Sequence, residues 1–343
     1  MGTFRFFLAT VIVYIHTSAE LRGSSLFQSS FTYSAYHTII SFFIISGFII
    51  LLSLDKNYYK SNQSYFLQSS KFYLNRILRI YPLYIFSILV FYIDVFYLNI
   101  IRPSDYISRF PQIVDLEYIF QNVFLLFQWS WFDLNLINSV AWSIDVELHW
   151  YLAAPLVYYI FYHKYNSSIA RISFYLFYIY SSRYFNVPPL PELVRELVPF
   201  FYGFIVYDIY LIYQKKLKNI IDIRYLLILS AILISSPLVV DFSISMYLYY
   251  LGVVFLCLSI NFKHKIDKFF GDLSYPMFII HQPLFFIIFL QVNKYASIFE
   301  FNEENSFLLI FLISMIFFII VCYFILLIFQ YPIDKLRVKI KFL

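Results

Sequence analysis

Ten apolar runs, each close to the length of a bilayer span, follow one another along this chain. A helix needs about 20 apolar residues to cross the hydrocarbon core of a membrane. The runs lie near residues 4–19, 33–54, 80–101, 142–162, 171–186, 196–213, 224–240, 243–261, 273–292 and 306–330. Because lipid offers no hydrogen bonds to the backbone, we predict an all-α fold, a polytopic bundle of about ten transmembrane helices.

The composition agrees with this class. Hydrophobic residues make up 62% of the 343 residues and charged residues only 13%, which excludes an ordinary soluble protein. Ten spans joined by short loops use up the whole length. We therefore expect residues 1–343 to form a single integral-membrane domain.

The basic residues predict the orientation of the spans. With ten crossings and a cytoplasmic N-terminus, 19 of the 25 Lys and Arg residues fall in cytoplasmic segments, as positive-inside sorting produces. An eleventh crossing at residues 118–128 would put the later basic loops outside. We therefore expect both termini in the cytoplasm and residues 102–141 outside, with 118–128 as an interfacial or re-entrant helix. The net charge of +5 then needs no nucleic-acid partner.

The sequence indicates neither a metal site nor a cleaved leader. Cys257 and Cys322 lie inside apolar runs, so we interpret them as small buried hydrophobic residues and not as a disulfide or a metal-ligand pair. The first apolar run resembles the core of a secretory signal, but Arg5 and His16 within it argue against cleavage.

Ionisable residues inside apolar runs are the main functional signal, because each costs several kcal/mol in lipid. His16 lies eleven positions after Arg5, roughly 16 Å deeper at about 1.5 Å per residue. Glu147, five residues after Trp142 on a helix that enters from outside, reaches a similar depth. An imidazole beside a carboxylate suits general-base catalysis, and a purely structural polar pair is the alternative.

Three further features could bind a ligand. Arg76 and Arg79 share a helix face at the cytoplasmic end of the third run, where they suit phosphate oxygens of a ligand or of lipid headgroups. Ser46 stands next to Gly47, a small-residue spot where helices or a ligand can approach closely. His281 lies between prolines in mid-membrane, which predicts a kinked stretch lined by polar groups.

Five of these features follow one another in order along the chain. They are Arg5-x10-His16, Phe42-Phe43-Ile44-Ile45-Ser46-Gly47-Phe48, Arg76-x2-Arg79 with Ile80-Tyr81-Pro82, Trp142-Ser143-x3-Glu147, and Ser274-Tyr275-x5-His281-x-Pro283. Each motif alone is common. Together they resemble the acyltransferase-3 family of membrane O-acyltransferases over residues 5–283.

The resemblance implies a bacterial inner-membrane enzyme that carries an acyl group, usually acetyl from acetyl-CoA in the cytoplasm, to a hydroxyl of an extracytoplasmic glycan. The acceptor remains open among O-antigen, lipooligosaccharide, exopolysaccharide and capsule, either free or lipid-linked. We also expect membrane lipids to surround the helix bundle. It implies that Arg5, Arg76 and Arg79 hold the CoA side and that His16 and Glu147 carry the chemistry. The expected cavity-lining residues are Ser46, Trp142, Ser143, Tyr275 and His281.

Two routes stay open within this reading. His16 either acts as general base on the sugar hydroxyl or accepts the acyl group itself, while Glu147 orients it. The chain departs from the family pattern at Leu148, where relatives often carry a second acidic residue, and it lacks a Gly before Phe42. It ends at Leu343 without a fused hydrolase-like domain, so it completes the transfer itself or passes the acyl group to a separate periplasmic partner.

The main rival function is a transporter or flippase for a lipid-linked sugar or a small anion. Such a protein would use His16 and Glu147 as a proton relay. A structural subunit of a glycan-assembly complex is the third hypothesis. No internal repeat is evident in the sequence, which counts against transport.

Overall fold

The computed structural model describes most of the chain as helix. The described residues are 1–22, 28–59, 64–93, 116–124, 136–164, 167–181, 190–217, 223–234, 242–259, 265–285, 287–288, 291–292 and 303–342. No strand occurs among them. The predicted all-α class is therefore confirmed.

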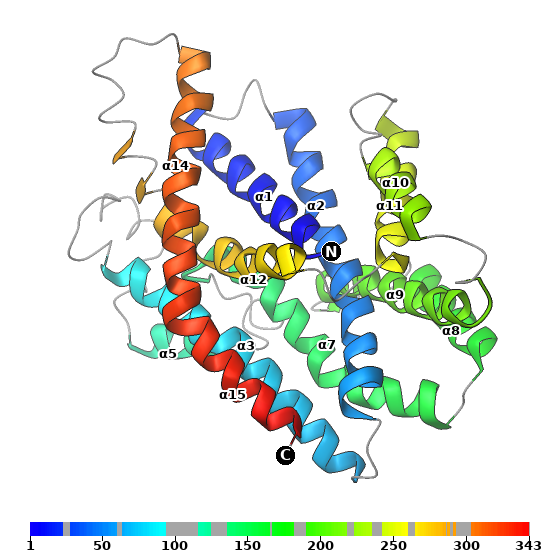
Figure 1. Cartoon of the computed structure of the whole chain (residues 1–343). Coiled ribbons are helices and arrows are strands. Elements are labelled where there is room, and N and C mark those ends of the chain that lie inside the picture. Colours follow the sequence, from blue (N-terminus) through cyan, green and yellow to red (C-terminus); the bar gives the residue numbers. More distant parts are fainter. Residues whose placement is uncertain are drawn as a thin grey trace. The chain divides into compact units, whose positions relative to one another are not determined.

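The helices fall into two compact units, and each unit contains segments that are far apart in the sequence. Figure 1 colours the helices by their position in the chain. The first unit contains Met1, His37–Ser70 and Val146–Lys265, and the second contains Gly2–Tyr36, Lys71–Asp145 and Ile266–Leu343. The prediction that residues 1–343 act as a single domain stays a prediction.

The helices of the first unit come mainly from the middle of the sequence. They are α2 (Gln28–Ser53, from His37 onward), η1 (Leu54–Tyr58), α7 (Trp142–Tyr158, from Val146 onward), η5 (Tyr159–Lys164), α8 (Ser168–Ser181), α9 (Leu190–Ile212), η6 (Tyr213–Leu217), α10 (Ile223–Ile234) and α11 (Phe242–Leu258).

The helices of the second unit come from both ends of the chain and from the region around α3. They are α1 (Gly2–Arg22), α3 (Tyr65–Ile93, from Lys71 onward), α5 (Leu116–Phe124), η4 (Ser139–Ala141), α12 (Lys265–Ile280), η8 (His281–Phe285), α14 (Glu303–Ile325), η10 (Leu326–Gln330) and α15 (Tyr331–Phe342).

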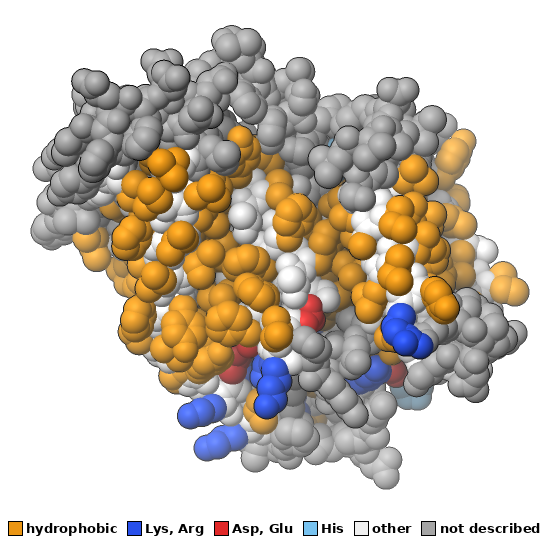
Figure 2. Space-filling view, turned by 45° about the horizontal axis from the view of Figure 1, so that its top comes forward, with side chains coloured by type: hydrophobic (Ala, Val, Ile, Leu, Met, Phe, Trp, Pro, Cys, Tyr) orange, Lys and Arg blue, Asp and Glu red, His pale blue; other side chains and the backbone are white. Residues whose placement is uncertain are grey.

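Apolar length and apolar surface identify a membrane protein. Four helical stretches within the described residues are long and apolar enough to cross a bilayer, and three shorter helices are also apolar. The long ones are His37–Tyr58, Tyr65–Ile93, Leu197–Lys215 and Leu309–Ile340; the short ones are Gly2–Thr17, Ile223–Ile234 and Leu248–Leu258. Apolar side chains cover broad areas of the surface in Figure 2. Phe177 and Ile228, for example, are 68% and 58% exposed. Such a surface is stable in lipid and not in water.

The helix predicted over residues 118–128 begins earlier than expected. It is seen as α5, Leu116–Phe124, while residues 125–128 lie outside the described part of the chain. The predicted count of ten spans, the cytoplasmic termini and the interfacial or re-entrant position of this helix all stay predictions.

The small-residue spot beside Ser46 brings two helices together. A Cβ on Gly47 of α2 would lie 2.5 Å from the carbonyl oxygen of Phe200, and a Cβ on Gly203 of α9 would lie 2.3 Å from that of Ile44. The neighbouring rings of Phe43 and Phe200 stack with centroids 4.9 Å apart. Close helix contacts through glycine are a common way to pack helices in lipid.

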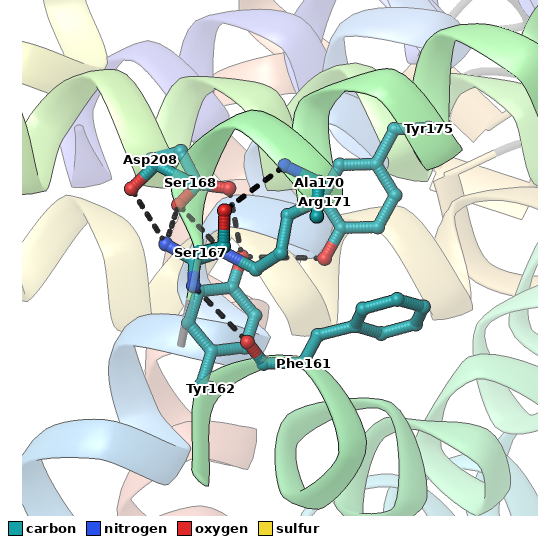
Figure 3. A network of polar contacts seen from close by, with 8 residues as sticks. All are labelled: Phe161, Tyr162, Ser167, Ser168, Ala170, Arg171, Tyr175 and Asp208. Carbon is teal, nitrogen blue, oxygen red and sulfur yellow. Dashed lines mark hydrogen bonds and ion pairs between the residues drawn. The ribbon is translucent and has the colours of Figure 1, made fainter. Parts of the chain in front are cut away.

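An ion pair inside the first unit ties α8 to α9 (Figure 3). Arg171 donates from Nε and Nη2 to Asp208 Oδ1 at 2.9 and 2.5 Å, and its side chain is only 2% exposed. Tyr162 donates to the other carboxylate oxygen at 3.1 Å, and its ring lies 4.2 Å from the guanidinium. The remaining Arg171 donors reach the Phe161 carbonyl and the Ser168 hydroxyl. A buried charge pair is stable only when its hydrogen bonds are met in this way.

In the second unit, α1 and α12 run in the same direction in nearly constant register. Thr3 contacts Asp267, Phe6 contacts Phe270 and His16 contacts His281, pairs that are separated by 264 or 265 positions in the chain. The two backbones meet near Gly2 and Gly271, where a Cβ on either residue would lie 2.9 Å from the other's Cα. The register therefore fixes the depth of every residue of α1 against α12.

Asp267 caps the start of α1 from the neighbouring helix. Its Oδ1 accepts from Thr3 N at 2.9 Å and from Thr3 Oγ1 at 3.1 Å. Partial burial by itself raises the pKa of this carboxyl, but the backbone donors of Thr3 and Gly2 outweigh it and lower the pKa to about 2. First-turn N–H groups have no partner within their own helix, so an acceptor here stabilises the helix end.

We predict that Gly203→Ala destabilises the protein by about 2 kcal/mol, because the added methyl group meets backbone that cannot move without separating α2 from α9. Thermal unfolding in nanodiscs measures the effect. Tyr202→Ala is the matched control, since the side chain of Tyr202 is 41% exposed on the same helix. Equal melting temperatures for the two variants would contradict the packing described.

We predict that Asp267→Ala lowers stability by about 1 kcal/mol at neutral pH, the usual cost of removing a helix-capping acceptor. The wild-type advantage is present above the ordinary Asp pKa of 3.8 and is lost as the pH falls towards about 2, because the folded-state pKa is depressed. Unfolding measured between pH 6 and pH 3 tests this. Glu117→Gln, at an exposed position on α5, is the control, and a difference from wild type that does not shrink on acidification would disprove the cap.

Candidate active site

The two histidines predicted to lie in mid-membrane meet each other in the second unit. His16 Nδ1 lies 2.8 Å from His281 Nε2, with the ring centroids 5.0 Å apart. His281 is 2% exposed, and His16 is half-buried on the same continuous helix as Arg5. The pairing joins α1 to η8 and is the polar contact around which the site is organised.

The hydrogen bonds assign the protons. His281 Nδ1 lies 2.7 Å from the carbonyl oxygen of Phe278, which can only accept, so this nitrogen carries a proton. Nε2 of neutral His281 is then an acceptor, and His16 Nδ1 must donate to it. The lone pair of neutral His16 is left on Nε2. That nitrogen is the atom that a general base or a nucleophile uses.

Pro283 explains why side chains reach the backbone of this turn. A proline has no N–H, so it cannot satisfy the carbonyl of Ile279 four residues earlier or that of Phe278 five residues earlier. These carbonyls accept from Asn138 Nδ2, at 2.8 Å, and from His281 Nδ1. In the π-helical turn η8, two side chains thus donate hydrogen bonds to carbonyls that the proline nitrogen cannot reach. Such π-helical turns are frequent at functional sites.

The end of the predicted external segment braces the same turn. Asn138, which is completely buried, donates from Nδ2 to Ser87 of α3 at 2.9 Å as well as to Ile279. Ser139 donates to Gln282 Oε1 at 2.9 Å. The described part of residues 102–141 is therefore attached directly to the residues on either side of His281.

The three arginines predicted to hold the donor share one charge network in the second unit. Arg79 and Arg5 both act electrostatically on the carboxylate of Asp272, in the middle of α12. Arg76, one turn from Arg79, is 5% exposed with its guanidinium 4.9 Å from the ring of Phe72. On α1, Arg5 of this network is eleven residues from His16.

The remaining predicted residues hold local structure. Tyr275 donates to the carbonyl of Ile80 at 3.0 Å, which joins α12 to the Arg76–Arg79 helix. Ser143 is buried and donates to the Val140 carbonyl at 2.9 Å, while Trp142 and Ser46 are half-buried. Their role as cavity lining stays a prediction.

Glu147 belongs to the first unit and His16 to the second, and the predicted pairing of the two stays a prediction. In the first unit Glu147 accepts a hydrogen bond from the Tyr151 hydroxyl at 2.6 Å.

Asp145 was not among the residues singled out from the sequence. Its carboxyl group is completely buried in the second unit, where it acts electrostatically on Tyr81 and Tyr84. The sequence feature that could have identified Asp145 is its position two residues before Glu147.

Fold and site together define a polytopic membrane protein with a histidine pair between α1 and η8 and with arginines on α1 and α3 that share one charge network. The acyltransferase domain of the acyltransferase-3 family matches residues 2–327. The chain belongs to this family and is a membrane acyltransferase. Searches of curated proteins and of solved structures give no match.

We predict that His281→Phe lowers acyltransferase activity by about 100-fold, because His16 Nδ1 loses its acceptor and the lone pair is no longer held on Nε2. Nitrogen NMR of histidine-labelled protein in nanodiscs should show the Nδ1–H tautomer of His16 in the wild type and its loss in the variant. A purely structural role would not move that signal. The exposed His163 supplies the control, His163→Gln. An unchanged His16 tautomer in His281→Phe would refute the assignment.

Proposed function

We propose that this acyltransferase moves an acetyl group from acetyl-CoA on the cytoplasmic side of a bacterial inner membrane to a hydroxyl of an extracytoplasmic surface glycan. The observation that carries the proposal is the His16–His281 hydrogen bond, which leaves a basic nitrogen on the helix that also carries Arg5. Membership of the family supplies acyl transfer, and the structure offers a group able to activate a hydroxyl.

The donor side follows from charge. A CoA head carries several phosphate charges and cannot enter hydrocarbon cheaply, whereas its narrow pantetheine arm can. Arg5, Arg76 and Arg79 suit those phosphates, since guanidinium groups bind phosphate through paired hydrogen bonds. The predicted topology puts all three at the cytoplasmic face. The thioester would then extend inward along α1 towards His16.

In the direct route, His16 Nε2 takes the proton of the sugar hydroxyl as that oxygen attacks the thioester carbonyl. A new C–O bond forms, the C–S bond breaks, and the thiolate of CoA leaves and takes up a proton. In the alternative route His16 Nε2 attacks the thioester carbonyl first, the C–S bond breaks, and CoA leaves as the thiolate. The sugar oxygen then attacks the acetyl group, the C–N bond to His16 breaks, and the proton of the hydroxyl passes to the CoA thiolate. His281 orients the imidazole in both routes, and a role for Glu147 beside it remains part of the proposal.

The acceptor is proposed only as a class: O-antigen, lipooligosaccharide, exopolysaccharide or capsule, free or lipid-linked. Residues 102–141 are the segment proposed to select it, because the described end of that segment contacts the turn that holds His281. A separate periplasmic protein that receives the acetyl group is a further possible partner.

The test is release of free CoA from acetyl-CoA by the purified protein in nanodiscs, with and without glycan, together with mass spectrometry of the acetylated sugar. We expect His16→Ala to lower both by at least about 100-fold while leaving membrane insertion intact. His163→Gln serves again as the control. Normal acetylation by His16→Ala would remove the proposal, and movement of a lipid-linked sugar without CoA release would favour a transporter instead.

A further inference from the structure

Helix α15 at the end of the chain is fastened to α3 beside the predicted donor arginines (Figure 1). Asn75 of α3 donates from Nδ2 to the backbone carbonyl of Arg337 at 3.0 Å, and Arg337 Nε donates to Asn75 Oδ1 at 3.0 Å. The amide is 2% exposed, so its two bonds replace water at this contact. Asn75 lies four residues before Arg79 on the same face of α3, and the contact therefore places Arg337 on the side of α3 that carries Arg79.

The guanidinium of Arg337 is held in one orientation. Nε is occupied by Asn75 and Nη1 by the carboxylate of Asp334, one turn earlier on α15. The side chain is 15% exposed, unlike the exposed Lys335 and Lys339 on the same helix. A cation that is fixed at two of its nitrogens and mostly removed from water is not a typical lipid-facing anchor, because such an anchor keeps its rotamer freedom.

Arg337 belongs to the same charge network as the predicted donor residues. Arg79 and Arg76 act on it electrostatically, and Asp334 acts on both Arg337 and Asp272. The groups linked in this way are five cations and two carboxylates among the described residues, namely Arg5, Arg76, Arg79, Lys268, Arg337, Asp272 and Asp334. Partly buried charges of one sign repel each other, and an anion among them removes that cost.

We propose that Arg337 is a fourth phosphate-binding arginine of the donor site, and that Asn75 is the residue that positions it. The ligand class is a phosphate-bearing nucleotide such as the CoA head, so the inference rests on the proposed function. Arg76 and Arg79 lie on one helix and present their groups from one side. Arg337 approaches from a second helix, and binding between two helices surrounds a compact polyanion better than one face can.

The phosphate could also come from a lipid headgroup, which offers the same chemistry at the same membrane surface. The two sources differ in what competes for the site. A headgroup site responds to the content of anionic lipid, whereas a donor site responds to free CoA in a bilayer of zwitterionic lipid.

The experiment is titration of CoA into the whole protein in phosphatidylcholine nanodiscs, repeated in nanodiscs that contain phosphatidylglycerol. We expect Arg337→Gln to weaken CoA binding by about tenfold and the matched control Lys339→Gln, two residues away and exposed, to change it less than twofold. If Arg337→Gln does not fold, Arg337→Lys replaces it. That variant keeps the charge without the forked donors, and we expect a loss of about threefold.

A double-mutant cycle tests the role of Asn75. We expect Asn75→Ala to weaken CoA binding in the same direction, and Arg337→Gln added to it to cause little further loss, since both changes remove one interaction. Fully additive losses would overturn the positioning role. Thermal unfolding of each variant reports any general loss of structure.

The outcomes separate this inference from the proposed function. Wild-type protein that binds no CoA defeats both. CoA binding that is weakened by Arg76→Gln but not by Arg337→Gln or Arg337→Lys overturns the fourth arginine and leaves acetyl-CoA as the donor. An effect of Arg337→Gln that appears only with phosphatidylglycerol, with CoA affinity unchanged in phosphatidylcholine, assigns the site to a lipid headgroup and overturns the inference.

Discussion

The hydrogen bond between the two imidazoles is the contact on which the site of this acyltransferase depends. It is set by a chain of causes that begins with one residue, because Pro283 has no N–H to offer to the carbonyl of Phe278 or that of Ile279. One of them receives the proton of His281 Nδ1, which makes the other nitrogen of that ring an acceptor. The tautomer of His16 is therefore determined by the backbone of a different helix.

The sequence predicted the class of fold correctly, and it selected candidate site residues, because a membrane restricts both the fold and the positions of charged residues. Apolar runs of span length predict helices, and an ionisable residue inside such a run has few reasons to be there. His16 and Arg5 were selected by this reasoning, whereas Arg76 and Arg79 were selected as a pair on one helix face at the end of the third run. The structure puts the three arginines in one charge network and His16 on the helix that carries Arg5.

Pairing between distant residues could not be read in the same way. His16 was predicted beside Glu147 because the two reach similar depths, yet depth alone does not say which helix is the neighbour. The contact with His281 depends on the parallel register of α1 and α12, which Asp267 and the glycine contact set. Arg171 shows the same limit. The count of loop charges treats Arg171 as a cytoplasmic cation, whereas the structure buries it against Asp208. No local sequence pattern predicts a partner that lies 37 positions away.

The parallel packing of α1 against α12 holds the two helices in one fixed register. Asp267 binds Thr3 in the first turn of α1, and His281 binds His16 thirteen residues later. The helix therefore cannot slide or rotate without breaking both contacts together. The spacing between Arg5 and His16 along α1 is thus set by the helix itself. In the proposed donor site, a carrier whose flexible arm does not match the distance from Arg5 to His16 would bring its reactive carbonyl to the wrong level along α1. The packing of two helices would then select the donor by its molecular length.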